Sequence, residues 1–316
     1  MNEFISCDWG TSAFRLRLID TLTKNVLAEV KANMGIAATY AAWKESGEND
    51  RVCFYSSFLA VQVKALEQQC HSKLDNTAIV MSGMVSSNIG MIDLPYKELP
   101  FFTSGSDTLT HLIPPSEQLK NKMIILSGAR TNEDVMRGEE TKLIGCETAD
   151  EKDEQLFIMP GTHCKHIVVQ DRMATRFKTF MTGEVFNLLT TKSILAASVE
   201  KNKAEQSIEA ITSFTEGVLE GASNNLLNSI FHVRTNKLFD YYTAKDNYNY
   251  LSGLLIGSEL KDLAQKDYAH ITLVANGSLA FYYLQALQTL GVTTNVHTID
   301  SDKALVAGQR RIYMQQ

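Results

Sequence analysis

The sequence predicts an α/β fold built from two similar domains, and three observations support this prediction. The chain has 316 residues, of which 44% are hydrophobic and 21% charged, and this length suits two globular domains better than one. Short apolar runs of strand length alternate with longer segments of helical periodicity. A strand, a Gly-Thr turn and a second strand recur in each half, and the spacing from Gly10 to Asp20 equals that from Gly161 to Asp171. Two related α/β domains that face each other across a cleft are therefore expected.

The first half begins with strands and continues with a helix. Apolar Phe14, Leu16 and Leu18 alternate with polar residues, which indicates a half-buried strand. From Val52 to Leu66, apolar residues recur at steps of three and four, which indicates an amphipathic helix. We expect strands at 4–9, 13–20, 26–30, 78–81 and 123–126 and a helix that includes 52–66.

The second half repeats the opening strand pattern and adds more helices. A buried strand ends at Met159 and is followed by Pro160, Gly161 and Thr162, which is typical of a turn. We expect strands at 156–159, 163–170, 175–181 and 271–275, and helices at 137–146, 208–220, 250–264, 279–290 and 304–314.

Composition and charge exclude several classes of protein. The net charge of −6 gives no basic surface for a nucleic acid, and no apolar run approaches the roughly 18 residues that span a bilayer. The N-terminal residues carry no basic and apolar regions of an export signal. No CxxC pair indicates a zinc site, and reduced thiols in the cytoplasm are expected for the five cysteines, Cys7, Cys53, Cys70, Cys146 and Cys164.

The two Gly-Thr turns are candidates for phosphate binding. Each turn exposes backbone N–H groups and a hydroxyl, and a glycine lets a phosphate approach the backbone closely. Asp8 lies two residues before Gly10, where a carboxylate could hold Mg²⁺ through water. One such turn alone reads as an ordinary hairpin, whereas the pair favours a site for the β- and γ-phosphates of a nucleotide. The chain contains neither a GxxxxGK[ST] P-loop nor a strand–GxGxxG–helix pattern.

Four further segments carry candidate side chains, and each has a structural alternative. Arg137 and a carboxylate of Asp134, Glu139 or Glu140 could bind an anionic substrate and act as a general base, although acidic residues are also common in a first helical turn. His163 and Lys165 flank the second turn and could contact phosphate or serve the strand. The loop that contains Ser82, Gly83, Met84 and Asn88 could offer donors to polyol hydroxyls, or merely connect strands. Asn276, Gly277 and Ser278 form a strand-to-helix turn of the kind at which nucleotides bind.

Six motifs together resemble the 2-dehydro-3-deoxygalactonokinase family of the sugar kinase/Hsp70/actin superfamily. The resemblance runs in order over nearly the whole chain, and its motifs are CDWGT at 7–11, SGMV and SNIG at 82–85 and 87–90, VMRGEET at 135–141, MPGTHCK at 159–165, MTGE at 181–184 and LSGLLIG at 251–257.

The resemblance implies two ribonuclease H-like (actin-type ATPase) domains with ATP in the cleft between them. The expected domains are 1–130 and 131–301, and a C-terminal helix at 302–316 can pack back on the first. The implied reaction transfers the γ-phosphate of ATP, with Mg²⁺, to the C6 hydroxyl of 2-dehydro-3-deoxy-D-galactonate in galactonate catabolism. The expected partners are therefore ATP and a small sugar acid in the cytoplasm, with no nucleic acid or membrane, and a homodimer is compatible with the chain.

Residues are assigned by matching motifs. Glu139 corresponds to the catalytic base of the superfamily. The superfamily carries Gly-Asp where this chain has Gly138-Glu139, and the interval from this acid to Gly145 is one residue shorter here than in the superfamily. Glu140 and Asp134 therefore remain candidates. Arg137 is expected to bind the substrate carboxylate. The expected ATP and phosphate site comprises Asp8, which also holds Mg²⁺ through water, Gly10, Thr11, Ser12, Gly161, Thr162, Lys165, Asn276, Gly277 and Ser278, and the expected substrate site comprises Ser82, Gly83, Met84, Asn88 and Arg137.

Two other functions remain open from the sequence. A nucleotide-gated protein of the actin or Hsp70 kind would share the phosphate turns but would need a polymer or peptide surface. A kinase for another sugar or sugar acid would share the whole site, because the sequence does not fix the stereochemistry of individual hydroxyls.

Overall fold

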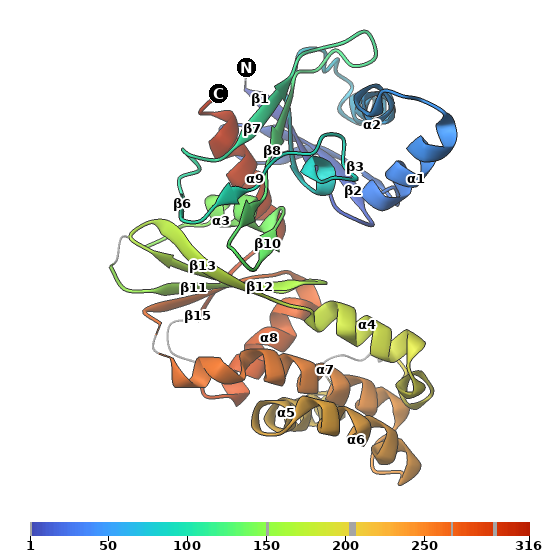
Figure 1. The fold of residues 1–316 in the computed structure, drawn as a ribbon, viewed down its shortest axis with the longest axis vertical. Helices are drawn as coiled ribbons and strands as arrows, with labels where there is room; N and C mark the ends of the chain where they lie inside the picture. Colours follow the sequence, from blue (N-terminus) through green and yellow to red (C-terminus); the bar gives the residue numbers. More distant parts are fainter. Residues whose placement is uncertain (1, 150–151, 202–206, 267, 293–295) are drawn as a thin grey trace. The chain divides into compact units, whose positions relative to one another are not determined.

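The computed structural model describes residues 2–149, 152–201, 207–266, 268–292 and 296–316, and the chain divides into two compact units (Figure 1). The first unit comprises Met1–Asp150, Gln170–Arg176 and Ser301–Gln316, and the second comprises Glu151–Val169 and Phe177–Asp300. Residues 131–150 therefore group with the first unit, whereas the sequence analysis set the boundary at residue 130.

The packing of two helices explains this grouping. Helix α3 (Glu139–Gly145) lies directly against α9 (Ser301–Tyr313) in the first unit. A Cβ on Gly145 would lie 1.8 Å from the carbonyl oxygen of Ala304, and a Cβ on Gly308 would lie 1.8 Å from that of Thr141. Only glycine permits this backbone approach, so α3 and α9 form one packed pair.

The first unit is built around a six-stranded sheet with the order β3-β2-β1-β4-β8-β7. Strand β1 pairs antiparallel with β2 and parallel with β4. The strands are β1 (Glu3–Trp9), β2 (Phe14–Asp20), β3 (Val26–Ala32), β4 (Ile79–Gly83), β7 (Thr110–Ile113) and β8 (Met123–Leu126). The short strands β5 (Lys97–Glu98), β9 (Ala129–Arg130) and β10 (Val135–Met136) form a separate three-stranded sheet.

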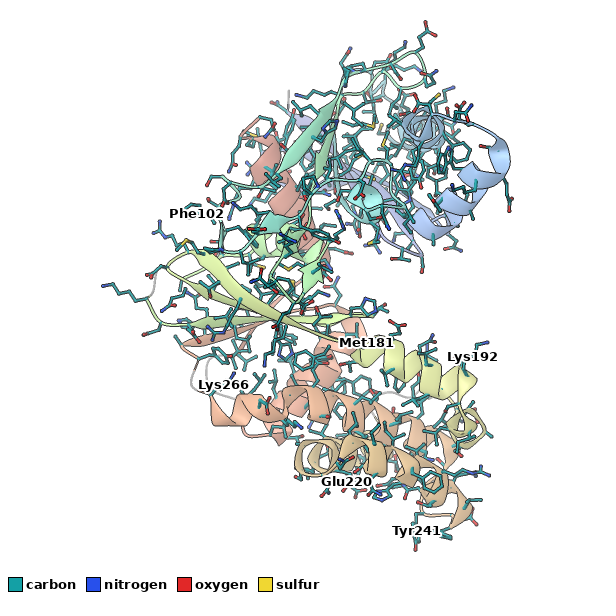
Figure 2. All side chains as sticks on the ribbon, viewed as in Figure 1. Phe102, Met181, Lys192, Glu220, Tyr241 and Lys266 are labelled. Atoms are coloured by element: carbon teal, nitrogen blue, oxygen red, sulfur yellow. The ribbon has the colours of Figure 1, made fainter. Side chains whose placement is uncertain are left out.

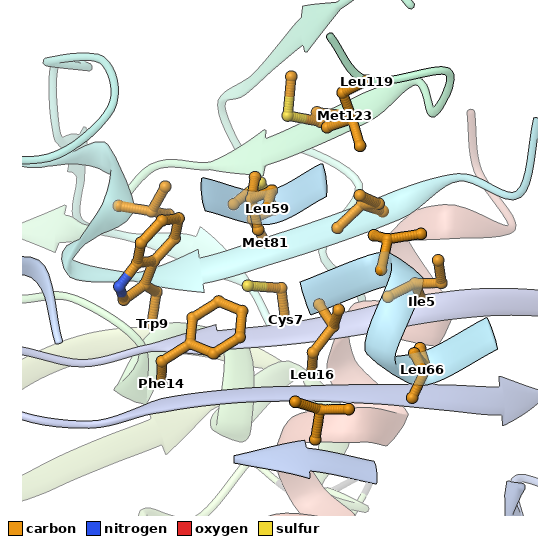
Figure 3. Packing of buried hydrophobic residues seen from close by; sticks show 14 of the residues in the cluster. Ile5, Cys7, Trp9, Phe14, Leu16, Leu59, Leu66, Met81, Leu119 and Met123 are labelled. Atoms are coloured by element: carbon orange, nitrogen blue, oxygen red, sulfur yellow. The ribbon is translucent and has the colours of Figure 1, made fainter. Parts of the chain in front are cut away.

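The alternation of β1 assigns its side chains to two different faces. Ile5, Cys7 and Trp9 join a core cluster with Leu59 and other residues of α2 (Arg51–Cys70), as Figure 3 shows. Phe4, one residue out of phase, instead stacks on Tyr313 of α9, with ring centroids 5.4 Å apart. Asp8 shares the phase of Phe4, so it belongs to the α9 face of the sheet.

The second unit repeats this strand order. Its sheet runs β15-β14-β11-β12-β13, and β6 (Phe101–Phe102) pairs with the first residues of β13, which group with the first unit. The strands are β11 (Gln155–Met159), β12 (Cys164–Gln170), β13 (Met173–Phe180), β14 (His270–Val274) and β15 (Val296–Ile299). Strand β11 pairs antiparallel with β12 and parallel with β14, as β1 does with β2 and β4. The predicted repeat, and the prediction of two ribonuclease H-like units, are confirmed.

Helices cover the sheet of the second unit in layers (Figure 1). Helices α5 (Ile208–Ser223), α7 (Ala244–Leu260) and α8 (Gly277–Thr289) share a core with β11 and β14. Gly217 and Gly221 on α5 face Gly253 and Gly257 on α7, where added Cβ atoms would lie 2.0–2.2 Å from backbone oxygens. The LSGLLIG motif therefore serves this helix contact.

The sequence analysis missed α1 (Ile36–Ser46), α4 (Thr182–Lys192), α6 (Leu226–Leu238) and β15. Helix α4 has no fully buried residue, and α6 buries only Ser229 and Val233, so neither shows the apolar stripe by which a helix is recognised. Across the described ranges, no helix combines the length and hydropathy that are needed to cross a bilayer. All five cysteines are unpaired thiols.

Candidate active site

The first Gly-Thr turn joins β1 to β2 and is hydrogen-bonded to the start of α1. The carbonyl oxygens of Gly10 and Thr11 accept hydrogen bonds from the N–H groups of Ile36 (2.9 Å) and Ala37 (3.1 Å) at the start of α1. Gly35 makes this approach possible, because a Cβ there would lie 2.4 Å from the Thr11 oxygen. Thr11 and Ser12 are exposed at the tip. The turn is therefore a fixed platform with exposed hydroxyls.

The second turn joins β11 to β12 and is held by α4 in a comparable way. The N–H of Glu184 donates to the carbonyl of Thr162 at 3.0 Å, and the imidazole of His163 pairs with the Glu184 carboxylate. Thr162 is exposed at the tip, whereas Lys165 is 4% exposed and its ammonium donates to the carbonyl of His163 at 3.3 Å. The structure thus gives His163 a partner on α4 and Lys165 a contact within the turn itself.

Gly10 and Gly161 occupy these tips without a structural need for glycine. Neither has a positive φ, a Cβ on Gly161 would meet nothing within 4 Å, and one on Gly10 would meet only the Ala13 oxygen at 3.6 Å. Packing and backbone strain therefore explain neither glycine. Close approach of a ligand to the backbone would explain both, as the phosphate hypothesis expects.

Asp8 lies at the end of β1, beside the end of β4. A Cβ on Gly83 would lie 3.8 Å from Oδ1 of Asp8. Burial raises the pKa of Asp8, and the cations of Lys142, Arg15 and Arg17 partly oppose this rise. Within the described ranges, no donor hydrogen-bonds to the Asp8 carboxylate, and no three acidic, His or Cys side chains gather as a metal cage. A single unengaged carboxylate fits Mg²⁺, which usually takes one or two protein carboxylates and completes its shell with phosphates and water.

The start of α3 lies next to this point. Gly138 precedes the helix with φ 102°, and a Cβ there would lie 3.5 Å from the Cα of Gly83. Glu139 is partly exposed at the first helical position. Within the first unit, the structure thus brings Asp8, Gly83 and the Gly138-Glu139 step together. The second turn and Asn276–Ser278 belong to the other unit.

Glu140 and Asp134, the alternative bases, have other contacts. Glu140 is 3% exposed, and its two carboxylate oxygens accept from the N–H of Gly138 (2.7 Å) and the hydroxyl of Thr141 (2.9 Å). Asp134 accepts from the N–H of Val135 at 2.8 Å in the turn before β10. Glu140 thus caps the helix start from inside the protein, and Glu139 is the more accessible carboxylate of the pair.

Burial and the neighbouring Glu139 carboxylate raise the pKa of Glu140 from 4.5 to about 7. Between these values the folded protein keeps a proton that the unfolded chain has lost, so the free energy of unfolding falls as pH rises, by about 1.4 kcal/mol per pH unit. Glu140→Gln removes this group, so urea denaturation should show a smaller loss of stability from pH 4.5 to 7 in the variant. Parallel stability profiles for the variant and the wild type would contradict the assignment.

Arg137 is engaged within the first unit, contrary to the role expected from the sequence. Its Nη1 donates to the carbonyl and hydroxyl of Ser86, its Nη2 to the carbonyl of Leu94 (3.2 Å), and its Nε to the hydroxyl of Tyr96 (3.1 Å). The guanidinium also stacks on the Tyr96 ring, 4.0 Å from its centroid, and the side chain is 6% exposed. These contacts use the donors that a substrate carboxylate would need, so the geometry supports a role in ordering the loop after β4.

Arg137→Ala should therefore cost stability rather than selectivity for an acid. Hydrogen bonds to a charged group contribute about 1.5–3 kcal/mol each, so we expect a loss of at least about 2 kcal/mol in urea denaturation. Any rise in KM should be equal for the sugar acid and for its neutral analogue, with Arg137→Lys as the charge-preserving control. A KM rise confined to the acid, at unchanged stability, would restore the carboxylate-binding role.

The loop after β4 is compact and ordered by its own hydrogen bonds, since the N–H of Gly90 donates to the Ser87 carbonyl at 2.8 Å and that of Leu94 to the Ser86 carbonyl at 3.1 Å. Ser82, within β4, is fully buried and its hydroxyl accepts from Nε2 of Gln309 on α9 at 2.8 Å. Gly90 folds back so closely that a Cβ would lie 2.2 Å from the Val85 oxygen. Of the predicted substrate residues here, Met84 is partly exposed and Asn88 is exposed. Ser82 and Gly83 are both buried.

The second unit contains a pocket of about 200 Å³ beside its Gly-Thr turn. The pocket is lined by Gly161 and Ser278 and by side chains from three helices, Phe186 on α4, Tyr248 and Asn249 on α7, and Leu279, Tyr282 and Tyr283 on α8. Its volume is below the roughly 300–1,000 Å³ of pockets for a whole drug-sized ligand, so it suits a flat group such as a nucleobase. The sequence analysis found only Gly161 and Ser278, because the aromatic residues come from separated helices.

Known proteins resemble this chain over most of its length. The family described as 2-keto-3-deoxy-galactonokinase matches residues 8–312. The 2-dehydro-3-deoxygalactonokinase of Escherichia coli (strain K12) is 36% identical over 248 residues, which cover 75% of this chain and 79% of that protein. The "probable 2-dehydro-3-deoxygalactonokinase" of Rhizobium meliloti (strain 1021) is 31% identical over 313 residues, which cover 96% and 94% of the two chains.

Solved structures give the same result. A Sinorhizobium meliloti protein with the provisional name of 2-dehydro-3-deoxygalactonokinase superposes with a TM-score of 0.80 at 30% identity, over 99% of this chain and 96% of that one. The (R)-2-hydroxyglutaryl-CoA dehydratase component A of Acidaminococcus fermentans, with a TM-score of 0.52 at 11% identity over 100% and 99% of the chains, shares the fold alone. The repeated turns, the strand order and the family match over nearly the full length lead to one conclusion: the chain belongs to the 2-keto-3-deoxy-galactonokinase family of carbohydrate kinases.

Proposed function

We propose that this protein transfers the γ-phosphate of ATP to the C6 hydroxyl of 2-dehydro-3-deoxy-D-galactonate, as a cytoplasmic step of galactonate catabolism. The phosphate-transfer part of the proposal rests on one observation. Gly10 and Gly161 lie at the tips of two hairpins, and neither packing nor backbone conformation requires a glycine at either position. The names of the related proteins support the choice of sugar acid.

In this proposal, the Gly-Thr turn of each unit contributes to the binding of the ATP phosphates. Backbone N–H groups and the exposed hydroxyls of Thr11, Ser12 and Thr162 donate to phosphate oxygens, and Lys165 adds positive charge near the second turn. The adenine of ATP occupies the aromatic pocket of the second unit, and Asn276, Gly277 and Ser278 flank the ribose at the start of α8. The small volume of the pocket and its contact with Gly161 support this division of the nucleotide.

Glu139 is the proposed base, and the loop with Met84 and Asn88 is the proposed sugar-acid site. A carboxylate at the partly exposed helix start can accept the proton of the attacking hydroxyl, and phosphoryl transfer otherwise depends on positioning and charge neutralisation. Asp8 is the residue that would hold Mg²⁺, which when bound neutralises phosphate charge. Because the Arg137 guanidinium is engaged with the Ser86 and Leu94 carbonyls, the proposal does not assign it to the substrate carboxylate.

A substrate panel tests the proposal directly. Purified protein is incubated with ATP, Mg²⁺ and a series of sugars and sugar acids, and ADP release is measured by a coupled assay. The expected result is strong stimulation by 2-dehydro-3-deoxy-D-galactonate, with the product phosphorylated at C6 by NMR. Preference for another acid would revise the substrate, and slow hydrolysis that no small substrate stimulates would favour an actin- or Hsp70-like nucleotide-gated protein.

A further inference from the structure

A buried carboxylate joins three elements behind the second Gly-Thr turn. Glu259 on α7 has a side chain that is only 1% exposed. Its Oε1 lies 2.9 Å from Nε2 of His166 on β12, and its Oε2 accepts from the hydroxyl of Tyr283 on α8 at 2.8 Å. The hydroxyl of Thr182, the first residue of α4, donates to the same oxygen. One side chain therefore ties a strand and two other helices together.

The network continues from Glu259 to the turn itself. The Tyr283 oxygen lies 3.1 Å from Sγ of Cys164, and this sulfur lies 3.4 Å from the Gly161 carbonyl oxygen and 3.5 Å from the Gly161 nitrogen. Because the Tyr283 hydrogen goes to the carboxylate, the thiol is the donor in its contact with Tyr283. A continuous chain of polar contacts thus runs from Glu259 to the backbone of Gly161.

Charge and burial keep these groups in the protonation states that the network needs. Burial, together with the Glu259 carboxylate, raises the pKa of Cys164 to about 11 and raises that of Tyr283 well above its ordinary range. Both groups are therefore neutral donors near pH 7. A polar group that is buried this deeply lowers the stability of the fold unless it is hydrogen-bonded. Loss of one partner therefore forces the remaining groups of the network to rearrange.

Helix α4 connects the same carboxylate to the other side of the turn. Gly183 follows Thr182, and a Cβ on Gly183 would lie 2.4 Å from the Gly161 carbonyl oxygen. Gly161, Cys164, Thr182 and Tyr283 all line the pocket beside the turn, whereas Glu259 does not. Glu259 is therefore not in direct contact with that pocket, and it can act on a ligand there through the residues that it holds.

We propose that Glu259 is a positioning residue, which fixes the Gly161-Thr162 turn and the start of α4 in the arrangement that binds ATP. The inference rests on the proposed function, because it assigns the phosphates to this turn. It also gives a role to the MTGE motif and to Glu259, which follows the LSGLLIG motif, since Thr182 and Glu259 meet in this network.

The test measures ATP affinity of the full-length protein by calorimetry, together with separate KM values for ATP and for the sugar acid. Glu259→Gln leaves one acceptor oxygen for donors on three elements, and Tyr283→Phe removes only the hydroxyl that links Glu259 to Cys164. Both variants should raise the Kd for ATP about tenfold, which corresponds to about 1.4 kcal/mol, and leave the KM for the sugar acid unchanged. Should Glu259→Gln not fold, His166→Leu decides the matter, because His166 contacts Glu259 but does not line the pocket.

Ser229→Ala is the matched control for a merely structural effect. The buried Ser229 hydroxyl also donates to a carboxylate, that of Glu220, and Figure 2 shows Glu220 apart from Met181, which precedes α4. This variant should lower Tm but keep the wild-type Kd for ATP. An unchanged Kd in both network variants, or an equal rise in Ser229→Ala, would overturn the inference. Failure of the wild type to bind ATP would instead refute the proposed function.

Discussion

Glu139→Gln is expected to lower kcat by about 10²–10⁴-fold, the usual contribution of a general base, while ATP and sugar acid still bind. Glutamine has nearly the same shape as glutamate but does not accept the hydroxyl proton. Glu139 begins α3 directly after Gly138, whose surroundings include Gly83 and, next to it, Asp8. Steady-state kinetics measures the fall in kcat, and calorimetry measures whether ATP and the sugar acid still bind.

The neighbouring carboxylates provide the controls. Glu140→Gln and Asp134→Asn alter residues with hydrogen bonds inside the protein, so they should change stability more than turnover. If Glu139 merely favoured the helix dipole, its replacement would cost about 0.3–1 kcal/mol of stability and turnover would be kept. Near-normal kcat for Glu139→Gln, with a collapse in one control, would move the base to that neighbour and leave the kinase proposal intact.

Much of the fold could be predicted because its strands carry their own signals. The alternation of Phe14, Leu16 and Leu18 predicted β2 to within one residue, and the repeated Gly-Thr turns predicted that both sheets begin in the same way. Helices α4 and α6 carried no such signal, because they contribute few buried side chains. Periodicity reports burial, so it misses elements that lie on the surface.

The site was predictable in part, for a related reason. Turn glycines are visible in the sequence, but the partners of a side chain are not. Arg137 looked available for a substrate, yet its donors reach Ser86, Leu94 and Tyr96, which are at least 41 positions away in the chain. The pocket beside Gly161 likewise draws on α4, α7 and α8. Tertiary contacts of this range leave no local pattern to read.

Gly161→Val and Gly10→Val are expected to weaken ATP binding by at least about 100-fold without unfolding the protein. The added valine side chain would occupy the space in which a phosphate approaches the backbone. Each hydrogen bond to the charged phosphate that is lost weakens the binding free energy by about 1.5–3 kcal/mol. The fold should tolerate both changes, because neither glycine has a positive φ and neither Cβ meets an atom closer than 3.6 Å. Calorimetry measures the affinity, and thermal unfolding verifies the fold.

Adenosine serves as the internal control for this pair, because it carries the base and ribose but no phosphate. Its affinity should be unchanged in Gly10→Val, since Gly10 belongs to the first unit and does not line the aromatic pocket. Gly161→Ala and Gly10→Ala should show smaller losses of ATP affinity than the valine variants, because one methyl group obstructs less. If Gly161→Val binds ATP normally while folded, or Gly10→Val loses adenosine and ATP equally, then the glycine concerned does not serve a phosphate and the proposed phosphate site is wrong.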